Sequence, residues 1–104
     1  MNDLKIFENA EFGQVRTSTI NNEPYFCMSD ICKSLDITNV SDAKRRLKED
    51  GVVSSEVIDS LGRKQSMTIV NEFGIYDTIF SSRKKEAKEF KRWAFNVIKE
   101  LREQ

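Results

Sequence analysis

The chain has 104 residues, of which 38% are hydrophobic and 33% charged, and it contains no histidine. The lack of histidine excludes Ser-His-Asp and Cys-His catalytic sites as well as Cys/His zinc sites. No apolar run approaches the roughly 20 residues that a membrane-spanning helix requires, and the N-terminus lacks the apolar core of a signal peptide. We therefore expect a cytoplasmic protein of one domain, residues 1–104, that binds no metal or cofactor.

The charges are unevenly distributed, although 17 basic and 17 acidic residues cancel over the whole chain. Residues 1–60 hold seven Lys/Arg and eleven Asp/Glu, a balance of −4, whereas residues 61–104 hold ten and six, a balance of +4. Because phosphates respond to the local field, a neutral chain with a basic half is compatible with nucleic-acid binding. It is equally compatible with a merely uneven surface.

The first third of the chain predicts a small antiparallel sheet. Residues 4–9 and 14–20 read as strands, and a third strand over 24–28 follows the polar turn 21–23. The clearest alternation of apolar and polar residues involves Leu4, Ile6, Val15 and Thr17.

Two short helices are predicted next. Ser29 is expected to cap a helix over 29–35, and Ser41 a helix over 41–50 that Gly51 ends. This helix–turn–helix arrangement is similar to the DNA-binding motif of that name, in which the second helix would be the recognition helix, but such pairs are common in α+β domains.

Cys27 and Cys32 are predicted to be reduced and to pack in the core as small side chains. A disulfide between them would require the fold to bring their Cα atoms close together. With no second pair of cysteines, they cannot complete a four-ligand structural zinc site.

The second half predicts a β-hairpin and two helices. Strands over 52–60 and 64–71 bracket a basic tip that includes Arg63. Asn71 is expected to begin a helix that reaches residue 82, with Phe73, Ile75, Tyr76, Ile79 and Phe80 on its apolar side. Ser82 is expected to cap a last, longest helix that ends near residue 102. The order of elements predicts an α+β fold in which this helix packs against the sheet.

The last helix separates its residues by charge. At about 100° per residue, one arc is apolar and contains Phe90, Ala94, Val97, Ile98 and Leu101, with Trp93 at its margin. A second arc is basic and contains Lys84, Lys88, Lys91, Arg92, Lys99 and Arg102. Phe95 falls within the basic arc, and we expect it to reach the core. A solvated helix usually mixes its charges, so this segregation favours a face that contacts phosphates.

Two segments of the sequence are distinctive, PYFCMSDICKSLDITN and MTIVNEFGIYDTIFSSRKKEAKEFKRWAFNVIKEL. With the hairpin between them, they resemble the BRO-N domain, the N-terminal module of baculovirus-repeated-ORF proteins and prophage antirepressors. The resemblance covers about Phe7 to Arg102. Lys85 departs from the family, where proline is frequent, and Lys99-Glu100 replaces an ending of the Pro-Ser type, so we expect the helix to continue there. The most specific matches are Asn71-Glu72, Gly74-Ile75-Tyr76, Ser82-Arg83-Lys84, Ala87, Phe90, Arg92 and Trp93.

The resemblance implies a non-enzymatic module of a phage or prophage transcriptional regulator that binds double-stranded DNA in the bacterial cytoplasm. A variable C-terminal domain normally follows such a module, so the chain is expected to be the N-terminal part of a longer protein or a short member that stands alone. Gly74-Ile75-Tyr76 reproduces half of the GIY-YIG nuclease signature, but no Tyr-Ile-Gly follows, and the triplet lies in a helical pattern. The residues predicted to contact DNA are Lys44, Arg45, Lys48, Arg63, Lys64, Arg83, Lys84, Lys88, Lys91 and Arg92.

Two alternatives remain open. The chain could be a protein-interaction module whose basic arc meets an acidic surface on a phage repressor. It could also be a homo-oligomerisation domain in which the last helix pairs through Phe90, Trp93 and Val97.

Overall fold

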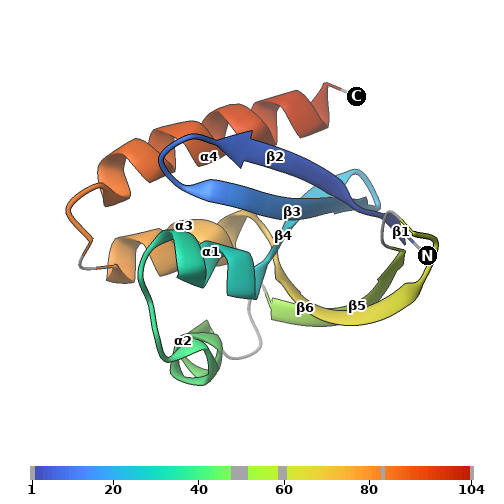
Figure 1. Ribbon diagram of the computed structural model, residues 1–104, viewed down its shortest axis with the longest axis horizontal. Helices are drawn as coiled ribbons and strands as arrows, with labels where there is room; N and C mark the ends of the chain where they lie inside the picture. Colours follow the sequence, from blue (N-terminus) through green and yellow to red (C-terminus); the bar gives the residue numbers. More distant parts are fainter. Residues whose placement is uncertain (1, 48–51, 59–60, 83, 104) are drawn as a thin grey trace.

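The computed structural model describes residues 2–47, 52–58, 61–82 and 84–103; for residues 2–3, 41, 44, 46–47, 52–58 and 65 it describes the backbone alone. The fold is α+β, as the sequence predicts (Figure 1). In chain order the elements are β1 (Asn2–Asp3), β2 (Lys5–Asn9), β3 (Gly13–Ile20), β4 (Glu23–Cys27), α1 (Met28–Ser34), α2 (Val40–Leu47), β5 (Val52–Ile58), β6 (Lys64–Val70), α3 (Glu72–Ser81) and α4 (Ala87–Arg102).

The strands form one sheet in the order β1-β5-β6-β4-β3-β2, and β1 and β5 are its single parallel pair within the described part of the chain. The β3–β4 turn holds Asn21 and Asn22 at φ angles of 52° and 67°. Asparagine tolerates this left-handed region, and two such residues are what a tight hairpin turn of the type I′ class requires. The predicted hairpin of the second half is confirmed, with Ile58 opposite Lys64.

The sheet curls because its two edge strands are neighbours in the chain. β1 and β2 stand at opposite ends of the strand order, yet Leu4 alone separates them. The two edges must therefore approach each other at Leu4, and Figure 1 shows the β5–β6 hairpin curving round towards the N-terminus. Curling of this kind leaves little unpaired sheet edge exposed.

The core lies between the sheet and the helices α1, α3 and α4. α1 contacts β3, β4 and β6, while α4 contacts β4 and α3. The apolar arc predicted for the last helix is confirmed, because all five of its residues are buried. The buried core residues are Phe12, Val15, Phe26, Met28, Ile31, Cys32, Leu35, Val70, Ile75, Ile79, Phe90, Ala94, Val97, Ile98 and Leu101.

Three helices begin at residues other than the predicted ones. α1 begins at Met28, so Ser29 lies inside its first turn and does not cap it. α2 begins at Val40, and the Asn39 side chain caps it in place of Ser41 by accepting a hydrogen bond from the Asp42 amide (2.9 Å). In both helices the cap lies two residues before the predicted serine, because helix boundaries are the feature that a sequence pattern determines least well.

The last helix begins at Ala87, five residues after the predicted cap at Ser82. The Ser82 hydroxyl instead accepts a hydrogen bond from the Lys84 amide (3.1 Å) and fixes the turn that separates α3 from α4. At the other end α4 continues through Lys99 to Arg102, as the sequence predicts. In the described part of the chain, no helix combines the length and the apolar composition needed to span a bilayer.

Asn71 caps α3 as predicted, with its Oδ1 accepting a hydrogen bond from the Gly74 amide at 2.9 Å. Replacement of an N-cap asparagine by alanine typically costs about 1 kcal/mol, because an orphan amide of the first turn loses its acceptor. We therefore expect Asn71→Ala to lower the free energy of unfolding in urea by about that amount. Asn96→Ala, at an exposed position within α4, is the matched control and should not destabilise the protein. Equal destabilisation by both changes would contradict the capping role.

Three phenylalanines predicted to be buried are exposed. On α3, Phe73 is 59% and Phe80 is 90% exposed, while Gly74 and Thr78 join Ile75 and Ile79 on the buried side. The buried side of α3 is thus rotated away from Phe73 and Phe80, whereas Tyr76 is partly buried against the core. On α4, Phe95 is 56% exposed and does not reach the core. On β2, Ile6 is likewise about half exposed, whereas Val15 and Thr17 on β3 are buried as predicted.

A partly buried ion pair ties β3 to α1. The Arg16 guanidinium contacts the Asp30 carboxylate through Nε (2.8 Å) and Nη2 (3.0 Å), and the Arg16 amide donates to the same carboxylate (2.9 Å). The hydrogen bonds to Asp30 raise the pKa of Arg16 further above its ordinary value. Bidentate pairs of this kind fix geometry as well as contributing energy.

Elsewhere, burial is the main cause of the raised pKa values of Tyr25 and Tyr76.

Both cysteines are buried free thiols, which confirms their predicted place in the core. Burial, with a smaller contribution from Cys27, raises the pKa of Cys32 from 9.0 to about 11. The neutral thiol is the favoured form in the fold, so this group's contribution to stability is complete below about pH 9 and is lost as the pH rises towards 11.

The same shift predicts slow alkylation of Cys32. At pH 8 a rise of the pKa from 9 to about 11 lowers the thiolate fraction by about 100-fold, and the thiolate is the reacting species. We expect iodoacetamide to modify Cys32 at least that much more slowly in the native protein than in urea, as measured by mass spectrometry of the modified peptides. Similar rates in the two conditions would show that the thiol is not buried.

Candidate nucleic-acid interface

The outer side of α4 carries four exposed cations, Lys88, Lys91, Arg92 and Lys99. At about 100° per residue they span an arc of about 100° beside the buried arc, with Lys91 at its margin next to Ile98 and Arg92 farthest from it. None of the four forms an ion pair with any residue that the structure describes. We call this surface, together with the exposed ring of Phe95 at its centre, the basic face of α4.

The acidic residues of α4 lie elsewhere on the helix. Glu89 and Glu100 project from the flank that also carries Trp93, on the other side of the helix from Lys91. Arg102, part of the predicted basic arc, pairs with Glu72 at the start of α3 and is engaged within the fold. The basic face therefore keeps its positive potential in a chain of zero net charge.

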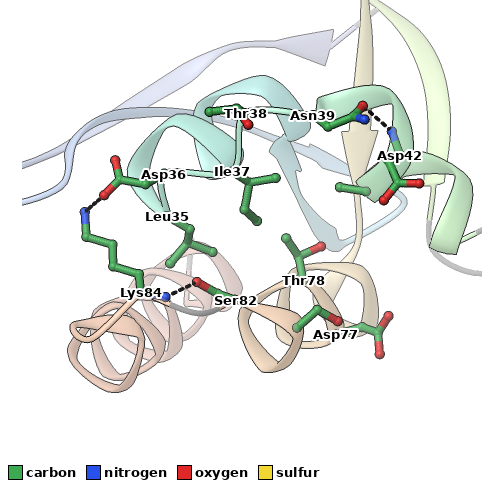
Figure 2. A pocket seen from close by; sticks show the side chains of 12 residues that line it. Leu35, Asp36, Ile37, Thr38, Asn39, Asp42, Asp77, Thr78, Ser82 and Lys84 are labelled. Atoms are coloured by element: carbon green, nitrogen blue, oxygen red, sulfur yellow. Dashed lines mark hydrogen bonds and ion pairs between the residues drawn. The ribbon is translucent and has the colours of Figure 1, made fainter.

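Lys84, a predicted DNA contact, is held inside the fold. Its ammonium donates to the Ser34 carbonyl oxygen (2.9 Å), pairs with Asp36 (3.3 Å) and lies 5.7 Å from the centre of the Phe12 ring. Its side chain is 18% exposed. Figure 2 shows the side chain reaching from the segment between α3 and α4 to the end of α1. These contacts give Lys84 a structural role in joining the two segments.

A groove lined in part by carboxylates lies beside α2. Arg45 is exposed and pairs with Asp42 at 2.6 Å, and Asp42 lines this groove between the α1–α2 connection and α3 (Figure 2). Asp36 and Asp77 also line this cavity of about 540 Å³. Two of these carboxylates are paired with cations, Asp42 with Arg45 and Asp36 with Lys84. Lys44 lies on α2 with its backbone alone described, and Lys48 lies outside the described residues, so recognition by this helix stays a prediction.

The remaining predicted contacts are distant from the start of α4 or lie outside the described residues. Arg63 and Lys64 are exposed at the turn between β5 and β6. Figure 1 places this turn and the first turn of α4 at opposite ends of the longest axis of the molecule. Arg83 lies outside the described residues. Among the described residues, the predicted contacts thus do not form one surface, and α4 brings Lys88, Lys91 and Arg92 together.

Pairing of two chains through the apolar side of the last helix is inconsistent with the fold. Phe90 and Val97 are buried in the chain's own core, and Trp93 is half-buried against Phe90 and Phe12. These side chains cannot also form an interface without unfolding the helix from the sheet.

Among the described residues, no group of three or more Cys, Asp or Glu side chains is arranged to hold a metal ion.

The fold and the basic helix define a small α+β module with a positively charged face on α4. The chain matches the BRO family, N-terminal domain, over residues 14–100, and it belongs to that family. This is a non-enzymatic family associated with phage and prophage antirepressor-like proteins.

Sequence and structure comparisons give one further relationship. The chain is 34% identical over 76 residues to an uncharacterized protein of Haemophilus influenzae. The match covers 73% of this chain and 38% of that relative, so the chain corresponds to little more than a third of the relative's length. No solved structure matches the chain.

Proposed function

We propose that the chain is a double-stranded DNA-binding domain of a phage- or prophage-type transcriptional regulator. The observation that supports this most is the basic face of α4, whose four cations are exposed and unpaired within the described structure. Four lysine or arginine side chains on one helix can neutralise phosphates on both sides of a DNA groove. Family membership supports the same function.

The dependence of binding on salt tests this proposal. Neutralisation of four phosphates gives a slope of log K against log salt concentration of about −3.6. The six contacts expected from sequence alone would give a slope nearer to −5, but Lys84 is engaged within the fold and the hairpin turn lies far from the start of α4. Fluorescence anisotropy with a labelled random duplex between 50 and 300 mM salt would measure the slope. Affinity that does not change with salt, or no binding at low salt, would contradict the proposal.

A second candidate function is binding to a protein partner such as a phage repressor, and the exposed side of α3 favours it. Phe73 and Phe80 lie about two turns apart with Asp77 between them, and Phe80 is almost fully exposed. Aromatic residues are enriched at the centres of protein interfaces. Phe80→Asp should then abolish capture of a purified repressor in the absence of DNA and leave binding to duplex DNA unchanged. Loss of DNA binding in this variant would assign the α3 surface to DNA instead.

A further inference from the structure

Phe95 occupies the centre of the basic face of α4. Lys91 and Lys99 lie one turn before and one turn after it, and Arg92 and Lys88 lie three and seven residues before it. Its ring is 56% exposed and has no aromatic partner among the described residues. The ring is more than half exposed and does not belong to the core, so the fold does not explain its position among the cations, and a role in binding is favoured.

The cations on both sides of the ring indicate the kind of surface that the helix meets. Lys88 and Lys99 are eleven residues apart, which corresponds to about 16 Å along the helix axis. The major groove of duplex DNA is about 12 Å wide, admits an α-helix, and has phosphates along both walls. The exposed side of α4 is convex and carries cations around an apolar ring. This arrangement matches a groove that has phosphates along both walls. Proteins that stack unpaired bases instead use a concave groove or the face of a sheet.

We propose that α4 lies in the major groove and that Phe95 contacts the C5-methyl groups of thymine, an inference that rests on the proposed DNA-binding function. The flanking lysines and Arg92 then hold the helix on the phosphates, and the ring supplies a preference for A·T pairs at the position it faces. The thymine methyl is the apolar group that the major groove offers to such a side chain. In Figure 1, α4 runs along the upper margin of the molecule with no other element above it, which leaves its outer side accessible.

Removal of the methyl group from DNA tests the contact directly. The probes are a 20-base-pair duplex of alternating A·T pairs, in which every register presents thymine methyls, and the same duplex with uracil in place of thymine. The wild-type protein should bind the uracil duplex more weakly, by about fourfold for each methyl contacted. Phe95→Ala should bind the two duplexes equally, with an affinity close to that of wild type for uracil DNA.

Phe80→Ala is the matched control, since Phe80 is exposed on α3 and should leave the preference for thymine unchanged. Equal binding of the two duplexes by wild type would overturn the inference, as would a thymine preference that survives in Phe95→Ala. Tighter binding of a single-stranded oligonucleotide, weakened by Phe95→Ala, would show base stacking and would also overturn it. Failure to bind any duplex at low salt would refute the proposed function itself, whereas salt-dependent binding without an effect of the methyl would refute only the role of Phe95.

Discussion

Replacement of Phe90 by alanine is expected to lower the free energy of unfolding by about 3–5 kcal/mol. Phe90 is fully buried and lies where α4 meets the rest of the core. Its ring packs edge-on against Phe12 at 5.1 Å and obliquely against Trp93 at 5.6 Å, both between ring centres. Truncation removes these contacts and leaves a cavity that the rigid sheet cannot close. Since domains of this size are stable by about 5–15 kcal/mol, much of the total would be lost.

Urea denaturation followed by circular dichroism would measure the effect. Phe95→Ala is the matched control, because it is the same substitution in the same helix at an exposed position. We expect it to change stability by no more than about 0.5 kcal/mol. If the two variants were equally destabilised, the assignment of the buried and exposed sides of α4 would be wrong.

Reversal of two charges on the basic face of α4, by the double substitution Lys88→Glu and Arg92→Glu, is expected to weaken binding to duplex DNA by at least about 100-fold. Each substitution removes a charge-assisted contact worth roughly 1.5–3 kcal/mol and places a like charge near the phosphates. The slope of log K against log salt should also become shallower by about one unit for each lost contact. Fluorescence anisotropy with the same random duplex measures both quantities.

The control is the double substitution Lys5→Glu and Lys33→Glu, which alters the total charge equally at exposed positions on β2 and α1. Its effect should be small, because charges farther than about 10 Å from the phosphates are largely screened at 0.1 M salt. Equal weakening by both double variants would show that only the overall field matters. Unchanged binding in the α4 variant would exclude this face as the site.

Most of the fold could be predicted from the sequence because local patterns determine it. Alternation identified the strands, the five-residue apolar arc identified the buried side of α4, and Asn71 identified the start of α3. The exposure of Phe73 and Phe80 could not be predicted in this way. Their spacing fits an apolar side of a helix, but the small residues Gly74 and Thr78 allow close packing on the side that is actually buried. Which side of a mainly apolar helix faces the core depends on tertiary packing.

The candidate site was predicted only in part. Segregation of the charges identified Lys88, Lys91 and Arg92, since helical periodicity alone brings them together. The long-range contacts of Lys84 with Ser34 and Asp36 carry no local signal, because fifty residues separate Lys84 from Ser34. The bidentate contact of Arg16 with Asp30 also carries no local signal, because it joins a strand to a helix.

Phe95 was identified in the sequence as lying in the basic arc, but it was assigned to the core on its hydrophobicity. In the structure the ring is 56% exposed and does not belong to the core. A residue whose position conflicts with its chemistry is a useful indicator of function, because the fold alone does not explain it.

The most direct test of α4 as the DNA-binding surface is a nuclear magnetic resonance titration of the ¹⁵N-labelled protein with a random duplex. We predict that the largest shifts of amide signals lie between Lys88 and Lys99, with small changes on α2 and at the hairpin turn around Arg63. Large shifts confined to α2 with α4 unchanged, or no shifts at low salt, would contradict the assignment.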